Sequence, residues 1–195
     1  MYIGKIVNAS SHVDYVCQVY GPGEAEQIPA PLDYGFGAFI GIEQEDGGLL
    51  VGLIANTMLL NPEFGNLGPR LSPQDELAVF SPDYLAEQAT LVAITVIGAM
   101  PAEGPVLQGV PPVSACIDAR VRRLTDAEVR AFHVCGGRFQ LGYMALLQGM
   151  QSNPLIPPLL LQVTHDLMGR FPEQASRLAI LRCNLAWRAA VLPAG

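Results

Sequence analysis

Short apolar runs separated by polar turns fill the first hundred residues, and this pattern predicts β-strands. The second run shows the alternation most clearly, because Val13, Tyr15, Cys17 and Val19 fall on one face. A hairpin turn is expected at Asp46-Gly47-Gly48, where the glycines supply backbone freedom. The predicted strands are residues 2–7, 13–20, 36–42, 49–60, 91–97 and 113–121, with a long surface loop at 61–73.

The pattern changes to a helical period after residue 124. Thr125 followed by Glu128 matches a capping box, which predicts a helix over 126–133 that ends at Gly136 and Gly137. Three more helices are predicted at about 139–150, 158–170 and 172–191. The last of these has two apolar stripes, which are Leu178, Leu181 and Leu185, and Ile180, Cys183, Trp187 and Val191. Such a wide apolar arc belongs either at the centre of a small bundle or under another chain.

These elements together predict an α+β protein. Several short strands with few helical signals favour a closed or nearly closed barrel, since closure leaves fewer exposed edges. We therefore expect a small β-barrel domain over residues 1–123, followed by a helical bundle over residues 124–195. A chain of 195 residues that is half hydrophobic is long enough to form either one sizeable domain or two small ones.

Charge divides unevenly along the chain and supports two units with different surfaces. Residues 1–100 carry a balance of −10 and residues 101–195 a balance of +3, which gives the net charge of −7. The acidic first half disfavours direct nucleic-acid binding there, because a phosphate backbone needs a basic footprint. The basic cluster of the chain, Arg120, Arg122 and Arg123, is too small to establish such contact.

Several sequence signals bear on location and redox state. The first residues lack the continuous apolar region of a secretory signal, and no apolar stretch reaches the roughly 18 to 20 residues of a bilayer span. We therefore expect a cytoplasmic protein without a membrane association. Cys17, Cys116, Cys135 and Cys183 contain no close pair, so buried free thiols are expected.

The order of elements in the first half resembles the HAS-barrel, the N-terminal barrel of HerA-type hexameric ATPases and of F-type ATP synthase subunits. The likeness lies in Tyr2-Ile3-Gly4-Lys5-Ile6-Val7, Asn8-Ala9-Ser10-Ser11, residues 13–20 and Leu50-Val51-Gly52-Leu53-Ile54. The resemblance implies a ring-forming or docking module, which in HerA-like proteins helps to contact the NurA nuclease. The chain contains no phosphate-binding loop ending in Gly-Lys-Ser or Gly-Lys-Thr, so ATP hydrolysis by this chain alone is not expected.

Candidate catalytic and metal sites each have a simpler structural interpretation. His133 and Cys135 could form a nucleophilic pair, but no third orienting residue is indicated by spacing, and a helix end with a buried cysteine is preferred. His165 and Asp166 are neighbours on a predicted helix and point about 100° apart, so they are not expected to form a joint site. His12 lies in the first turn, and three scattered histidines do not indicate a metal site. Glu43, Glu45 and Asp46 are expected to be solvated residues of a hairpin tip. We predict no catalytic residues, no metal site and no cofactor.

Interface candidates are found in two places. Arg120, Arg122 and Arg123 could contact phosphates or an acidic partner, or could equally be a solvated strand edge. Trp187, with Arg182 and Arg188, is the best candidate for an interface, because Trp and Arg are enriched at binding hot spots. Burial of Trp187 inside an intramolecular bundle is nevertheless the preferred placement.

The sequence thus predicts a non-enzymatic assembly or adaptor protein. In this hypothesis a stand-alone HAS-like barrel docks on a separately encoded HerA-type ATPase or NurA-type nuclease in DNA processing, or assembles with itself as a homo-oligomer. Two alternatives remain open from the sequence. One is a barrel that binds a small ligand or nucleic acid through Arg120, Arg122 and Arg123, and the other is an enzyme built around Cys135.

Overall fold

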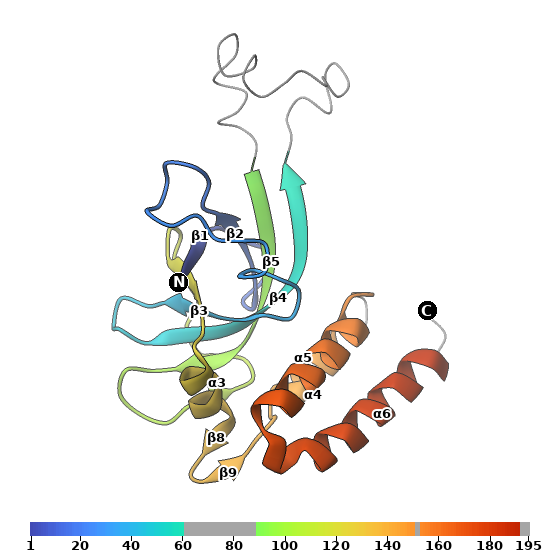
Figure 1. Cartoon of the computed structure of the whole chain (residues 1–195). Helices are drawn as coiled ribbons and strands as arrows, with labels where there is room; N and C mark the ends of the chain where they lie inside the picture. Colours follow the sequence, from blue (N-terminus) through green and yellow to red (C-terminus); the bar gives the residue numbers. More distant parts are fainter. Residues whose placement is uncertain (61–88, 151–152, 192–195) are drawn as a thin grey trace.

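The fold is a closed, six-stranded antiparallel β-barrel with a layer of helices on one side (Figure 1). It comes from a computed structural model that describes residues 1–60, 89–150 and 153–191. The strands follow the order β2-β1-β7-β3-β4-β5, and pairing of β2 with β5 closes the barrel. Their bounds are β1 Tyr2–Ala9, β2 Asp14–Val19, β3 Phe39–Glu43, β4 Leu49–Leu60, β5 Ala89–Met100 and β7 Arg120–Arg123.

The predicted barrel is confirmed, and most of its strands lie close to their predicted positions. The exception is the strand predicted over 113–121, since β7 begins only at Arg120. The preceding residues are irregular, with prolines at 111 and 112 and a left-handed backbone at Asp118, where φ is 63°. A two-residue strand, β6 Leu107–Gln108, pairs with β5 outside the barrel ring. The surface loop predicted at 61–73 lies outside the described residues.

Alternating side chains on the barrel strands belong to two different cores. On β4, Leu50 and Ile54 point into the barrel, whereas Val51 and Leu53 point outward and are equally buried. The outward residues pack against the helical segment, in a core that also contains Phe132, Leu159 and Val163. A strand buried on both faces explains why this part of the sequence reads as a continuous apolar run.

The first helix, α3 Asp126–His133, begins with the predicted capping box. The Thr125 side chain accepts a hydrogen bond from the backbone of Glu128, and the Glu128 carboxylate accepts one from the Thr125 backbone at 2.8 Å. After α3 come a short hairpin, β8 Val134–Cys135 and β9 Arg138–Phe139, and then α4 Met144–Gly149. The remaining elements are α5 Ile156–Arg170, the single turn η2 Pro172–Gln174, and α6 Ala175–Val191.

The predicted helical bundle is not confirmed. Helices α3, α4 and α5 all pack against the outward-facing barrel residues in one core, in which Leu159, Val163 and Leu167 of α5 are fully buried. Helix α6 packs alongside α5 on its far side and buries only Leu178 and Leu185 (Figure 1). The helices therefore share a core with the barrel, and the predicted division into domains at residue 123 stays a prediction. In the described part of the chain, no helix is long and apolar enough to cross a membrane.

Candidate docking site at the barrel mouth

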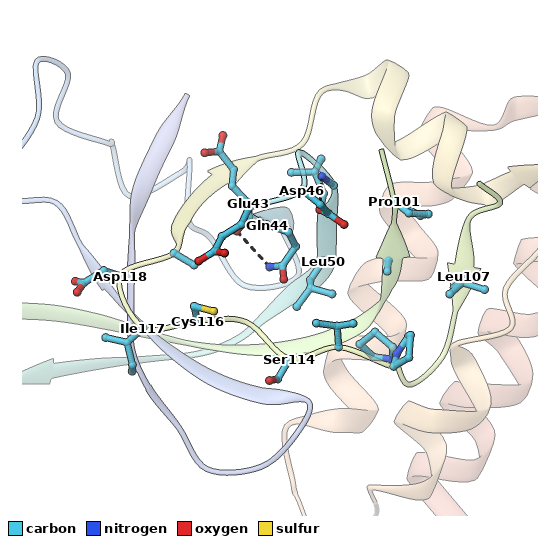
Figure 2. A pocket seen from close by; sticks show the side chains of 18 residues that line it. Glu43, Gln44, Asp46, Leu50, Pro101, Leu107, Ser114, Cys116, Ile117 and Asp118 are labelled. Carbon is cyan, nitrogen blue, oxygen red and sulfur yellow. Dashed lines mark hydrogen bonds between the residues drawn. The ribbon is translucent and has the colours of Figure 1, made fainter. Parts of the chain in front are cut away.

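A pocket of about 490 Å³ opens at one mouth of the barrel. One wall is the β3–β4 hairpin, and the other is the irregular segment 111–119 that leads into β7 (Figure 2). Its apolar lining includes Leu50, Pro101, Leu107, Val113 and Ile117. This volume lies within the range of about 300–1,000 Å³ that is usual for ligand pockets.

The hairpin wall is held by hydrogen bonds within its own turn. The Gln44 amide donates to the Gly48 carbonyl at 2.9 Å, and the Asp46 carboxylate accepts from the Gly48 amide at 2.9 Å. Gly47 has a φ of 81°, a conformation that favours glycine at this turn. The expected hairpin turn is therefore present, and it places Glu45 and Asp46 on the rim of the pocket.

The opposite wall is irregular but is anchored to the first two strands. His12 lies between β1 and β2, and its Nε2 donates to the Pro111 carbonyl at 2.8 Å. The Tyr15 hydroxyl donates to the His12 carbonyl at 3.0 Å and accepts from the Ala115 amide at 3.1 Å. The Asp118 amide donates to Ile6 at 2.9 Å. His12 and Tyr15 thus fix the wall in place, a role that sequence spacing does not indicate.

The pocket combines exposed apolar side chains with an acidic rim. Val113 is 61% exposed and Ile117 is 63% exposed, although both line the cavity. Four carboxylates lie around them, from Glu43, Glu45, Asp46 and Asp118. Glu43 and Asp118 pair with basic side chains, whereas Glu45 and Asp46 form no ion pair with any described residue. Apolar surface left open beside uncompensated negative charge is typical of a binding site.

The three arginines predicted as an interface lie on β7, and each has a partner within the chain. Arg120 pairs with Glu43 at 2.9 Å and lies over the Tyr2 ring. Arg123 donates to the Leu32 carbonyl at 2.8 Å. Strand β7 is flanked by β1 and β3, so the solvated-edge interpretation is wrong.

Arg122 joins this strand to the first turn of α3. Its guanidinium donates to both carboxylate oxygens of Glu128, at 2.6 and 3.0 Å. This hydrogen-bonded pairing is the main reason why the pKa of Glu128 falls to about 2, and the hydrogen bonds from Thr125 lower it further. The capping box and the end of β7 are therefore one connected structure.

His133 and Cys135 do not form a nucleophilic pair. His133 is fully buried, and its Nδ1 lies 2.7 Å from the Val129 carbonyl while Nε2 lies 2.9 Å from the Tyr143 hydroxyl. Burial lowers the pKa of His133 to about 4, which keeps the ring neutral near pH 7. Cys135 is half-buried, and its thiol donates to the Phe132 carbonyl at 3.7 Å. Both ring nitrogens are engaged elsewhere, so His133 cannot activate this thiol.

The other predicted residues are well separated from one another. His165 is exposed on α5, and its neighbour Asp166 pairs with Arg170 at 2.7 Å. Among the residues for which the structure gives positions, no three His, Cys, Asp or Glu side chains gather in a group that could hold a metal ion. Cys17 is a buried free thiol as expected, but Cys116 and Cys183 are exposed, so burial of all four is wrong.

On α6, the preferred burial of Trp187 is wrong. Its side chain is 66% exposed, and Arg182 and Arg188 are exposed as well. The interface prediction for these three residues remains a prediction. They lie on α6, whereas none of the residues that line the barrel-mouth pocket belongs to that helix.

The pocket itself was missed by the sequence interpretation, although one signal for it exists. Residues 105–117 contain three prolines together with apolar Val106, Leu107, Val110, Val113 and Ile117. Prolines interrupt a ladder, so some of these apolar side chains had no regular strand to bury them. The sequence interpretation assigned Glu43, Glu45 and Asp46 to a solvated hairpin tip, whereas in the structure they form one side of the cavity.

Comparison with known proteins identifies the family of the chain. A search of curated proteins finds no match for the chain. The model of one family, described as a domain of unknown function, DUF8166, matches residues 1–194. Because this match covers nearly the whole chain, barrel and helices together, the protein belongs to the DUF8166 family.

Proposed function

We propose that this protein is a non-enzymatic assembly protein whose barrel-mouth pocket binds a segment of a partner protein. The observation that carries the proposal is the open apolar pocket with its rim of carboxylates. Exposed Val113 and Ile117 would lose contact with water on binding, which is the main favourable contribution to most protein associations.

The chemistry of the pocket specifies the kind of segment it would bind. An apolar anchor would fill the cavity, and Arg or Lys side chains beside it would meet Glu45 and Asp46. The resemblance of the first half to HAS-barrels supports a partner of the HerA-type ATPase or NurA-type nuclease class, in DNA processing. The same resemblance and the charge division also support self-assembly.

Two other functions were considered, which are binding of a small ligand or nucleic acid through the β7 arginines and an enzyme built around Cys135. The contacts at both of these sites favour the assembly protein. Arg120, Arg122 and Arg123 are held by carboxylates or a carbonyl, so a phosphate would have to displace existing contacts. The thiol of Cys135 has no free imidazole beside it to act as its base.

Partner capture with a pocket variant tests the proposed function. Ile117→Arg places a cation in the pocket, where it would neutralise the acidic rim and obstruct an apolar anchor. The matched control is Leu32→Arg, because Leu32 is 84% exposed and lies outside the pocket lining. Tagged wild type, Ile117→Arg and Leu32→Arg would be purified from the native cell and the bound proteins identified by mass spectrometry.

The expected result is an ATPase or nuclease recovered in near-equal amount with wild type and Leu32→Arg, and reduced at least about tenfold with Ile117→Arg. Equal recovery with all three proteins would place the docking surface elsewhere. Recovery of no such partner by any of them would argue against an adaptor role.

A further inference from the structure

Helix α6 presents an apolar stripe that faces away from its own molecule. Ile180 is 65% exposed and Trp187 is 66% exposed, with Cys183 and Val191 exposed on the same face. The opposite face carries Leu178 and Leu185, which are buried. Both stripes expected from the sequence therefore exist, but only one of them is covered by the residues that the structure describes.

The charge of α6 indicates what kind of surface could cover the open stripe. The helix contains Arg177, Arg182 and Arg188 and no Asp or Glu. None of the three arginines pairs with a carboxylate in the described portion of the chain. A partner surface that is apolar and acidic would complement this helix.

Pairing of two α6 stripes would be opposed by charge. Arg177 and Arg188 are eleven residues apart, which is close to three helical turns, so they lie on the same flank of the stripe. An antiparallel pair of α6 helices would set this flank of one molecule against the same flank of the other. Like charges facing each other across the contact would weaken it.

The barrel-mouth pocket has the apolar interior and the negative charge that would complement α6. It is apolar inside, and its rim carries Glu45 and Asp46, which form no ion pair with described residues. Trp187 has the side chain best suited to fill such a cavity, because a Trp buries a large area and is enriched at hot spots. Arg188 follows Trp187 directly and could reach the acidic rim.

The two surfaces cannot meet within one molecule. In Figure 1 the β3–β4 hairpin projects on the left of the barrel, and α6 lies at the far right, beyond α5. Contact between them therefore requires two molecules. Because the two surfaces differ, each docked molecule would keep one of them free, which is the head-to-tail type of association.

We propose that α6 of one molecule docks in the barrel-mouth pocket of a second copy of this chain. Trp187 is the anchor, and Arg188 faces Glu45 and Asp46 of the other copy. This inference rests on the proposed function, since it takes the pocket to be a protein-docking site and names its occupant. It makes the protein its own partner, whether or not an ATPase or nuclease also binds.

Mixing two variants tests the head-to-tail arrangement. Trp187→Glu disables the helix and leaves the pocket intact, whereas Ile117→Arg disables the pocket and leaves the helix intact. Both side chains are largely exposed, so the variants should fold, as circular dichroism and thermal unfolding would verify. Solution mass would be measured by analytical ultracentrifugation for wild type, each variant alone, their equimolar mixture, and the control Leu32→Glu.

Wild type and Leu32→Glu are expected to associate as concentration rises, and each docking variant alone to associate at least about tenfold more weakly. The mixture should form a one-to-one heterodimer, because the intact helix of Ile117→Arg can enter the intact pocket of Trp187→Glu. A monomeric wild type, or a mixture that stays monomeric, would overturn the proposal.

Thiol protection provides a second readout on the wild-type chain. Cys116 lines the pocket and Cys183 lies on the exposed stripe of α6. Head-to-tail docking should slow labelling of both thiols together as concentration rises. Protection of Cys183 alone would indicate pairing of two α6 helices and would overturn the proposal.

The two proposals can fail separately. A monomeric wild type whose Ile117→Arg variant still loses an ATPase or nuclease partner would overturn self-docking and keep the proposed function. Concentration-dependent association that is unchanged by Ile117→Arg would overturn self-docking in the pocket. The proposed function would fail with it only if partner recovery were also equal for wild type, Ile117→Arg and Leu32→Arg.

Discussion

The Nε2 atom of His133 lies 2.9 Å from the hydroxyl of Tyr143, and both side chains are fully buried between the barrel and the helices. A carbonyl oxygen can only accept, so Nδ1 carries the proton donated to Val129 at 2.7 Å. Nε2 therefore accepts from the tyrosine hydroxyl. The rings of Phe39 and Phe171 lie within 6 Å of the imidazole, at 5.3 and 5.7 Å between centroids, and exclude water from the pair.

This pair should make stability depend on pH in a defined window. Burial lowers the pKa of His133 from 6.5 to about 4, so between these values the unfolded chain binds a proton that the folded chain does not. The contribution of neutral His133 to the free energy of unfolding is fully present above pH 6.5 and is lost as the pH falls towards 4. We expect the free energy of unfolding to drop by roughly 3 kcal/mol across the window, measured by urea unfolding at successive pH values.

Two variants separate the titration from the packing. His133→Leu has no group to titrate, so its unfolding free energy should change much less between pH 6.5 and 4. Tyr143→Phe removes the donor to Nε2, which should cost about 1–3 kcal/mol near neutral pH while the histidine still titrates. An equally steep pH dependence in His133→Leu would show that another group is responsible.

The capping box of α3 should produce a second loss of stability at lower pH. The hydrogen bonds from Arg122 hold the pKa of Glu128 at about 2, below its ordinary 4.5, so its contribution is present above pH 4.5 and is lost as the pH falls to 2. Glu128→Gln should be less stable than wild type at neutral pH and lose less on acidification. Glu45→Gln, on the hairpin, is the matched control and should follow wild type.

The hydrogen bond that the Thr125 hydroxyl accepts in the capping box can be tested separately from the Glu128 carboxylate. Thr125 accepts a hydrogen bond from the Glu128 amide at 3.3 Å, and Thr125→Ala removes this acceptor. We expect a loss of about 1 kcal/mol at neutral pH, measured by urea unfolding. Thr125→Ser keeps the acceptor and should be close to wild type, so equal losses in both variants would show that the methyl group matters and not the cap.

The barrel as a class of fold and the features governed by neighbouring residues were predictable from the sequence, whereas individual contacts between distant residues were not. The capping box at Thr125 and Glu128 and the turn at Gly47 depend on a few adjacent residues, and both appear where the sequence places them. The pocket depends on the His12 contact with Pro111, which joins positions 99 residues apart. Gln108 likewise donates to the Phe132 carbonyl at 2.9 Å, which no periodic pattern reveals.

The exposure of Trp187 was mispredicted because periodicity shows that a helix has two apolar faces but not which one is covered.

Thiol reactivity should follow the structure and not the sequence expectation. Burial raises the pKa of Cys17 to about 12, and its side chain is inaccessible, so it should react only after unfolding. Cys116 and Cys183 are exposed and should react quickly in dilute native protein with an aromatic disulfide reagent. Each of Cys116→Ser and Cys183→Ser should remove one fast-reacting thiol. A fast phase that survives the double variant would show that Cys135 or Cys17 is more accessible than the structure indicates.

Gly98 on β5 marks a close approach that a methyl group should disrupt. A Cβ atom there would collide with the Leu107 carbonyl of β6 and lie 2.9 Å from the Phe132 ring of α3. Both neighbours are fixed, one by the β5–β6 pairing and the other by the core, so neither can move without breaking contacts. Gly98→Ala should therefore lower the free energy of unfolding by about 1–3 kcal/mol, measured by urea denaturation at neutral pH. Gly169→Ala, near the end of α5 with no atom within 4 Å of the added methyl, should raise it by about 0.5 kcal/mol through helix propensity. A Gly98→Ala protein as stable as wild type would mean that β6 and α3 are not in tight contact with this strand, and that Leu107, which lines the pocket, is held less firmly than the structure indicates.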